Sequence, residues 1–175
     1  MRNLVFILIL AISSFADILV LEKGEIKAHT EIFGDSEINP KTNKISSNLV
    51  MGQDIESIKG NISINSLSLV SDSLSRDEHM YEVLNIGVNP TINFEIKSIQ
   101  KADENYQING LLTFNGIKKG ILSMVSISEA KKLTNIVGAF SIKLTQFNIE
   151  PPSLLFLTVR DQIDIKYNLL YKKGK

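Results

Sequence analysis

Residues 71–99 read SDSLSRDEHMYEVLNIGVNPTINFEIKSI, and the second part of this stretch has the clearest alternation in the chain. Ile92, Phe94 and Ile96 fall on one face of an extended strand, and the polar residues between them fall on the other face. Such a strand has one dry side and one wet side. The stretch therefore predicts a strand over 91–99 that covers an apolar core with one of its faces.

The polar first part of the same stretch predicts a short helix. Asp72 or Ser73 can cap a segment over 74–84, in which apolar residues recur at helical spacing. The segment is short, and it leads directly through Asn89-Pro90 into the strand. We therefore expect one or two turns of helix that lie across one end of the sheet structure.

Alternation with a period of two recurs on both sides of this stretch. Asn115-Gly116 is a strong hairpin signal, and Pro151-Pro152 interrupts any continuous ladder. In 61–70 the apolar positions slip by one residue, which would need a bulge near residues 65 and 66. Strand after strand with short turns indicates an all-β antiparallel barrel or sandwich. The expected strands are 25–33, 61–70, 91–99, 104–115, 117–128, 133–145 and 161–171, with a possible eighth over 44–51.

The composition excludes several classes of protein. The chain has 175 residues, enough for one domain, and its 19 basic and 19 acidic residues leave no basic surface for nucleic acid. Because it has no cysteine, it can form neither disulfides nor a thiolate metal site. Its stability therefore has to come from a large apolar core.

Residues 1–16 differ in composition from the remainder of the chain. Arg2 precedes a continuous apolar run over 4–12, and Ser14 and Ala16 are the small residues that signal peptidase cleavage requires. We interpret 1–16 as a cleaved signal peptide, because its apolar run is too short to span a bilayer. Residues 17–175 are then the mature domain. The alternative is an uncleaved anchor or a buried first strand.

Groups suited to catalysis are few. The chain has two histidines, His29 and His79, which lie fifty residues apart and lack the spacing of a zinc site. Alternation places His29 beside Lys27 and Glu31 on a solvated strand face, and His79 ends the charged run Arg76-Asp77-Glu78. We expect no enzyme activity, no metal and no cofactor. The alternative is a role for His79 as a general acid or base beside Asp77 or Glu78.

The predicted inner faces supply much branched and aromatic volume and few polar groups. A barrel of eight strands can be filled by such side chains, or it can leave room for a ligand. Gly110 and Gly138 lie within predicted strands, and Ser123 interrupts an apolar face. These three residues mark either kinks of the barrel or the close approach of another group.

An apolar patch is expected on the outside of the structure. If Asn115-Gly116 forms a two-residue turn, then Leu111, Leu122 and Met124 project away from the core. Such a patch indicates a contact in a homodimer or a docking site. The alternative is a register that shifts by one residue after Gly120.

Three spaced motifs occur in order along the chain: RDEHM over 76–80, NPTINF over 89–94 and YQINGLLTFNGIKK over 106–119. Together they resemble the pattern of the YceI-like family. The proline usual in that family after the last lysine is Gly120 here, and the arginine often found near the closing strands has no counterpart in 144–149. The resemblance implies an extended, lipocalin-like barrel of eight antiparallel strands, with an elongated cavity that holds a polyisoprenoid or another long-chain lipid.

We therefore hypothesise a periplasmic or secreted bacterial protein that binds a long-chain lipid without enzyme activity, for carriage or storage. The lipid is a polyisoprenoid, a quinone-like molecule or a fatty amide. The alternatives are an enzyme that acts on such a lipid through His79, and an interaction module with a solid core. Arg76, Asp77 and His79 are expected to shape the cavity mouth. The expected ligand-binding residues are Ile62, Ile64, Leu67, Leu69, Met80, Leu84, Ile92, Phe94, Ile96, Leu112, Phe114, Val125, Phe140, Ile142 and Phe147.

Overall fold

The computed structural model describes residues 16–32, 36–154 and 157–174. The predicted signal peptide therefore falls, except for Ala16, outside the described residues. Among the residues that are described, there is no helix with the length and apolar character that crossing a membrane requires.

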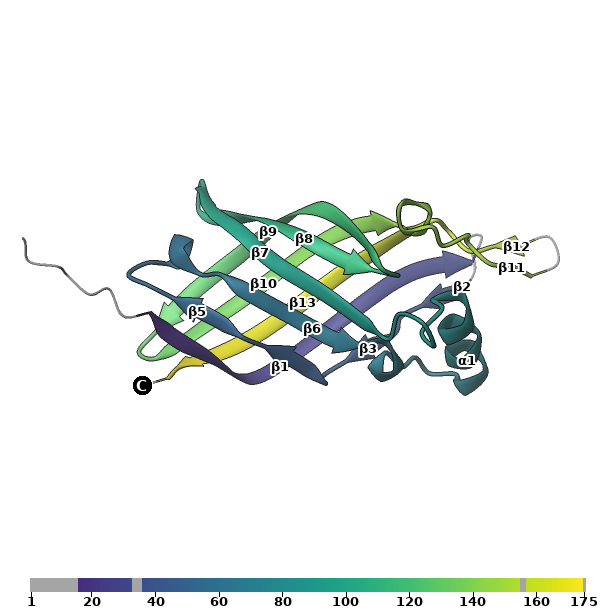
Figure 1. Cartoon of the computed structure of the whole chain (residues 1–175), viewed down its shortest axis with the longest axis horizontal. Helices are drawn as coiled ribbons and strands as arrows, with labels where there is room; N and C mark the ends of the chain where they lie inside the picture. Colours follow the sequence, from purple (N-terminus) through teal and green to yellow (C-terminus); the bar gives the residue numbers. More distant parts are fainter. Residues whose placement is uncertain (1–15, 33–35, 155–156, 175) are drawn as a thin grey trace, which may run out of the picture.

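Seven long strands form most of an antiparallel sheet, and neighbours in the sheet are mostly neighbours in the sequence (Figure 1). They pair in the order β1, β13, β10, β9, β8, β7 and β6. The alternation in the sequence favours these strands, and in β8 and the second half of β9 every second side chain is buried. Their bounds are Asp17–Ile32 for β1, Gly60–Asn65 for β6, Thr91–Ala102 for β7, Asn105–Phe114 for β8, Ile117–Ala130 for β9, Leu133–Lys143 for β10 and Gln162–Lys173 for β13.

The sheet closes on itself through the segment 41–51. This segment is divided into β3 (Lys41–Thr42), β4 (Ile45–Ser47) and β5 (Leu49–Met51). β3 and β5 pair with β1, whereas β4 pairs with β6, so the segment lies between the two outermost long strands. Counted as one strand position, it completes a barrel of eight, as predicted. β2 (Ser36–Ile38) extends the β1 side at one end.

The β8–β9 hairpin has the predicted two-residue turn. Phe114 pairs with Ile117, and the two residues between them, Asn115 and Gly116, both have positive φ angles, of 46° and 72°. This is the backbone that a type I′ turn requires and that an Asn-Gly pair adopts readily. The register is continuous through Gly120, so Leu122 and Met124 lie on the outer face as expected.

Several expectations need correction. The strand predicted over 61–70 ends at Asn65, and a 3₁₀ turn, η2 (Ser66–Ser68), takes the place of the predicted bulge. The side-chain oxygen of Asn65 accepts a hydrogen bond from the backbone N–H of Leu67, which ends the extended conformation there. The first strand starts at Asp17 rather than near residue 25.

The helix α1 (Leu74–Val83) has ten residues, nearly three turns rather than one or two, and Ser73 caps it. It lies at one end of the elongated barrel, near β2 and near a short hairpin of β11 (Ser153–Leu154) and β12 (Leu157–Thr158) that follows the two prolines (Figure 1). The chain ends at the opposite end of the barrel. Two more 3₁₀ turns, η1 (Ile55–Ser57) and η3 (Leu144–Phe147), connect strands.

The core consists of two clusters. The first fills the end of the barrel away from α1, where Leu19, Leu49, Met51 and Tyr171 are almost completely buried. The second lies on the α1 side and includes Leu84, Phe114, Leu144 and Phe147. Burial raises the pKa of the Tyr171 hydroxyl to about 12, and that hydroxyl lies 3.0 Å from the Ser47 hydroxyl. The end away from α1 is therefore packed solid.

Candidate ligand-binding cavity

The α1 side of the barrel contains a cavity of about 260 Å³. Inward side chains of the long strands form its wall, and Met80, Val83 and Leu84 of the α1 segment cover its end. The ionisable side chains in the lining are those of His29, Arg76, His79 and Tyr167. The wall is thus made almost entirely of hydrocarbon, as in sites for apolar ligands.

Most of the residues predicted to bind a ligand do line this cavity. They come from four strands and from the segment around α1, and the alternation of the sequence places them on the inner face. The lining residues among them are Ile62, Ile64, Leu69, Met80, Leu84, Ile92, Phe94, Ile96, Leu112, Phe114, Phe140 and Ile142.

Three of the predicted residues lie elsewhere. Leu67 is 56% exposed, because the turn at η2 rotates it out of the strand in which it was expected. Val125 is buried in the solid end, opposite Gly138 on β10. Phe147 is completely buried behind the wall, with its ring centroid 5.4 Å from that of Phe114.

Residues of β1 and β13 that the sequence-based prediction omitted complete the wall. Ile26 and Ala28 of β1 line the cavity, as do Ile163, Ile165 and Tyr167 of β13. The alternation of apolar and polar residues over 161–171 is the signal by which the β13 residues of the lining could have been found. In β1 the lining is interrupted by small and polar side chains, so its inner face was less evident.

Three aromatic rings lie across the cavity wall. Phe94 and Phe140 stack with centroids 5.9 Å apart, and the centroids of Phe140 and Tyr167 are 6.3 Å apart. Gly110 and Gly138 make this row possible, because a side chain at either position would overlap the ring of Phe94 or of Tyr167. The two strand glycines are therefore sites of close approach.

Ser123 faces inward and is completely buried. Its hydroxyl donates to the carbonyl of Ala139 at 3.0 Å and lies 2.8 Å from the Tyr167 hydroxyl. Burial raises the pKa of Tyr167 to about 12, although the hydrogen bond with Ser123 acts in the opposite direction. The tyrosine is therefore neutral at physiological pH and its hydroxyl is already engaged.

Two of the three residues predicted for the mouth lie at the cavity. Arg76 and His79 are in its lining, with Arg76 bound to Asp72 at 2.8 Å and His79 at 3.8 Å from Glu82. Asp77 is outside the lining: both of its carboxylate oxygens accept the backbone N–H of Ser71, at 2.9 and 3.0 Å. Asp77 therefore fixes the start of the helix rather than the mouth.

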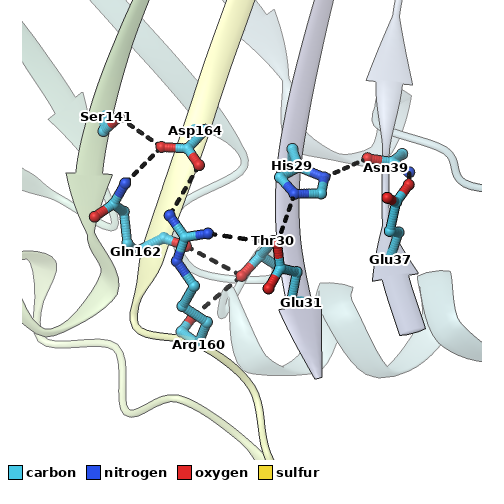
Figure 2. Close-up of polar contacts among 9 residues, drawn as sticks. All are labelled: His29, Thr30, Glu31, Glu37, Asn39, Ser141, Arg160, Gln162 and Asp164. Atoms are coloured by element: carbon cyan, nitrogen blue, oxygen red, sulfur yellow. Dashed lines mark hydrogen bonds and ion pairs between the residues drawn. The ribbon is translucent and has the colours of Figure 1, made fainter. Parts of the chain in front are cut away.

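A polar network fastens the rim next to α1 (Figure 2). The Arg160 guanidinium lies 2.9 Å from Asp164 of β13 and 3.7 Å from Glu31 of β1. Hydrogen bonds from Ser141 and Gln162, together with the charge of Arg160, hold the pKa of Asp164 below its ordinary value. The network thus joins strands β10, β13 and β1 at the open end of the barrel.

His29 extends this network to β2. Its ring nitrogens lie 2.7 Å from the side-chain oxygen of Asn39 and 3.3 Å from a carboxylate oxygen of Glu31 (Figure 2). The hydrogen bond with Asn39 and the nearby carboxylates of Glu31 and Glu37 raise the pKa of His29, against the effect of partial burial. No group of three or more possible metal ligands occurs among the residues described.

The expected outer patch is only partly exposed. Leu122 is 54% exposed and Met124 is 51% exposed, whereas Leu111 is half-buried. All three lie on the outer face of the β8–β9 hairpin, because Leu111 pairs with Gly120 and the alternation continues from there. A homodimer through this patch stays a prediction.

Curated proteins similar to this chain include UPF0312 proteins. One from Pectobacterium carotovorum is 35% identical over 65 residues, which are 36% of this chain and 34% of that protein. One from Serratia proteamaculans is also 35% identical over 65 residues, with the same coverage. The chain thus aligns with about a third of the length of these curated relatives.

Solved structures show the same fold at low sequence identity. Burkholderia cenocepacia BcnA superposes with a TM-score of 0.74 at 17% identity, over 84% of this chain and 95% of that one. A polyisoprenoid-binding domain from Saccharophagus degradans, described as implicated in plant cell wall breakdown, has a TM-score of 0.68 at 8% identity, over 91% and 100% of the two chains. Campylobacter jejuni YCEI protein has a TM-score of 0.60 at 19% identity, over 75% and 82%.

The model of the YceI-like domain matches residues 22–170, from the middle of β1 to the end of β13. The match covers every strand of the barrel wall, the helix across its end and all of the residues that line the cavity. The protein is a member of the YceI-like family.

Proposed function

We propose that this protein binds a lipid with a long hydrocarbon chain in its barrel cavity, without enzyme activity, for carriage or storage. The observation that carries the proposal is the cavity of about 260 Å³ with a hydrocarbon wall. The Saccharophagus relative of the same fold, described as polyisoprenoid-binding, supports it. A polyisoprenoid, a quinone-like lipid or a fatty amide would each present such a chain.

The size of the cavity limits how many carbons of a ligand it can hold. An apolar cavity of roughly 150 Å³ takes up benzene, so about 260 Å³ has room for about ten carbons. Burial of about ten methylenes contributes about 8 kcal/mol, and association consumes several kcal/mol of that gain. A chain of this length alone would bind weakly. Tight binding therefore needs further carbons, which would lie at the α1 end.

The mouth favours a polar head group there. Arg76 and His79 are the ionisable side chains of α1 that reach the lining, and both remain partly open to solvent. A head group at this position can keep its hydration while the chain is buried. We therefore place the head group beside α1 and the chain inside the barrel.

The test is extraction of the purified protein with organic solvent, followed by mass spectrometry. Ala28 lines the cavity, so Ala28→Trp should fill it and reduce the lipid recovered at least tenfold. Lys27→Trp changes the neighbouring, exposed residue of β1 and is the matched control. Equal recovery from both variants, or no lipid in the wild type and no uptake of added lipid, would overturn the proposal.

Absence of enzyme activity is part of the proposal. His79 lacks the partner that acid–base catalysis would need at this site, because Asp77 binds the Ser71 backbone and Glu82 lies 3.8 Å away on the solvent side. We expect the lipid extracted from His79→Ala to be unchanged in mass. Accumulation of a chemically different lipid in that variant would instead favour the enzyme. Export to the periplasm is likewise proposed, and cell fractionation tests it.

A further inference from the structure

The inner face of the barrel contains three glycines, each covered by a large side chain of the neighbouring strand. A Cβ atom at any of the three would lie under 3.0 Å from that side chain, closer than real Cβ atoms approach. The covering side chains therefore lie flat across the neighbouring strand instead of pointing along the barrel. The pairs are Gly24 with Leu169 (2.9 Å to Cδ2), Gly110 with Phe94 (2.6 Å to Cε2) and Gly138 with Tyr167 (2.6 Å to Cζ).

These pairs lie where the hollow part of the barrel meets the solid part. Ile96, Ile108, Ile136 and Leu169 line the cavity and also belong to the packed cluster beyond it. All four are at most 4% exposed. They form a floor that separates the cavity from the solid end.

The floor offers no free hydrogen-bond donor to a ligand. The polar side chain beside it, Tyr167, is bound to Ser123, and the Ser123 hydroxyl donates to the carbonyl of Ala139. Each hydroxyl hydrogen of the pair thus already has an acceptor. A polar group pushed against this floor would lose its hydration and meet only the Tyr167 oxygen as an acceptor.

We propose that this floor selects ligands by chain length: it accepts only the apolar end of a single chain and limits how far that chain can enter. This inference rests on the proposed function and adds a limit on the chain length of the ligand. Leu169 and Tyr167, held across Gly24 and Gly138, are the specificity-determining residues. The ligand class is a lipid whose polar group is confined to one end.

The first test uses the wild-type protein and needs no substitution. Binding of saturated fatty alcohols of increasing length is measured by displacement of a fluorescent apolar probe, together with the corresponding α,ω-diols. The diol of the best-bound length should bind about tenfold more weakly or worse, because its second hydroxyl would lose its hydration and find no free donor at the floor. Equal binding of alcohol and diol would overturn the inference.

The second test deepens the cavity by shortening a side chain of the floor. Leu169→Ala should shift the best-bound alcohol to a chain longer by about three carbons, the number that the substitution removes. Leu49→Ala removes the same atoms from the solid end, where Leu49 does not touch the cavity, and is the matched control. It should lower thermal stability comparably and leave the preferred length unchanged. The same preference in all three proteins would overturn the inference.

The third test makes the cavity shallower and covers the case in which Leu169→Ala fails to fold. Gly138→Ala should push the Tyr167 ring into the cavity and shorten the preferred chain, whereas Gly120→Ala, at a position with open space, should not. If the wild type binds no alcohol at all, the proposed function fails. If it binds alcohols without a length preference, only the floor inference fails.

Discussion

Phe94 and Glu95 are neighbours on β7 and have opposite surroundings. Phe94 stacks on Phe140 inside the barrel, whereas Glu95 forms an ion pair with Lys97 on the outer face. At the scale of the residue, side-chain direction therefore decides function. The alternation in 91–97 gave both directions correctly, because the strand is regular until the bulge between Ile96 and Ser98.

Phe94→Asp should unfold the protein or lower its free energy of unfolding by about 3 kcal/mol or more, because it buries an unpaired carboxylate where a ring was packed. Glu95→Ala should change stability by about 0.5 kcal/mol or less, since the ion pair that it removes is exposed. Urea denaturation followed by circular dichroism measures both. Equal effects would show that the two faces were assigned wrongly.

His29 should make the rim sensitive to pH. Its pKa is raised in the folded protein, so protonation favours folding: the contribution is full below about pH 6.5 and is lost as pH rises through the raised pKa. Only the protonated ring can donate to Asn39 and Glu31 at once. His29→Gln should flatten this part of the stability profile, measured by thermal denaturation, and Glu31→Gln should weaken it. An unchanged profile in His29→Gln would contradict the assignment.

At the scale of the element, α1 is held by a few specific contacts. The Tyr81 hydroxyl donates to the carbonyl of Leu69 at 2.7 Å, and Asp77 binds the backbone of Ser71. Burial and the nearby Asp77 carboxylate raise the pKa of Tyr81. Apart from Asp77, no side chain of this helix is fully buried. The helix is thus a thin cover over the cavity.

Asp77→Ala should loosen this cover. Loss of the carboxylate leaves the Ser71 N–H without its partner and should cost about 1 to 2 kcal/mol. Glu78→Ala, at the next and exposed position, is the control and should be nearly silent. Hydrogen exchange of the 74–83 amides gives the readout. Equal protection in both variants would contradict the structural role of Asp77.

Elements set by local signals could be predicted from the sequence, and those set by distant contacts could not. Alternation and the Asn115-Gly116 turn were sufficient for β7, β8 and β9. The exposed position of Leu67 was missed, because the Tyr81 hydroxyl, from a separate element, donates to the carbonyls of Leu67 and Leu69. The first residues of β1 were missed because 18–21 is continuously apolar and shows no alternation.

The cavity could be predicted only in part for a similar reason. The sequence shows which residues point inward, but it does not show whether their side chains meet. Val125 and Phe140 both point inward; Val125 is packed in the solid end and Phe140 lines the hollow. The difference depends on glycines that face larger side chains across the sheet, which requires the register.

At the scale of the whole molecule, the barrel is solid at one end and hollow at the other. A ligand can therefore act only on the α1 half. Removal of the ligand by organic extraction should lower the melting temperature. The loss of stability is about 2.7 kcal/mol when the free ligand had been about 100-fold above its Kd. Hydrogen exchange should rise in 74–83 and stay unchanged in 171–173. Uniform loss of protection would contradict the division.

The outer patch of Leu122 and Met124 concerns the assembly of whole molecules into a homodimer. If the predicted homodimer forms through it, Leu122→Glu should abolish self-association, measured by sedimentation over a range of protein concentrations. Val137→Glu places a charge on another exposed apolar side chain and is the control. A strictly monomeric wild type would rule out the dimer.

The solid end also affects how this protein could be reused. The interactions that keep the barrel shut lie where no guest reaches, so an emptied molecule should keep its shape and be ready to load again. Folding and cargo choice then depend on different sets of residues. Over evolutionary time, substitutions on the α1 side of the floor could change which ligand is bound and leave the fold intact.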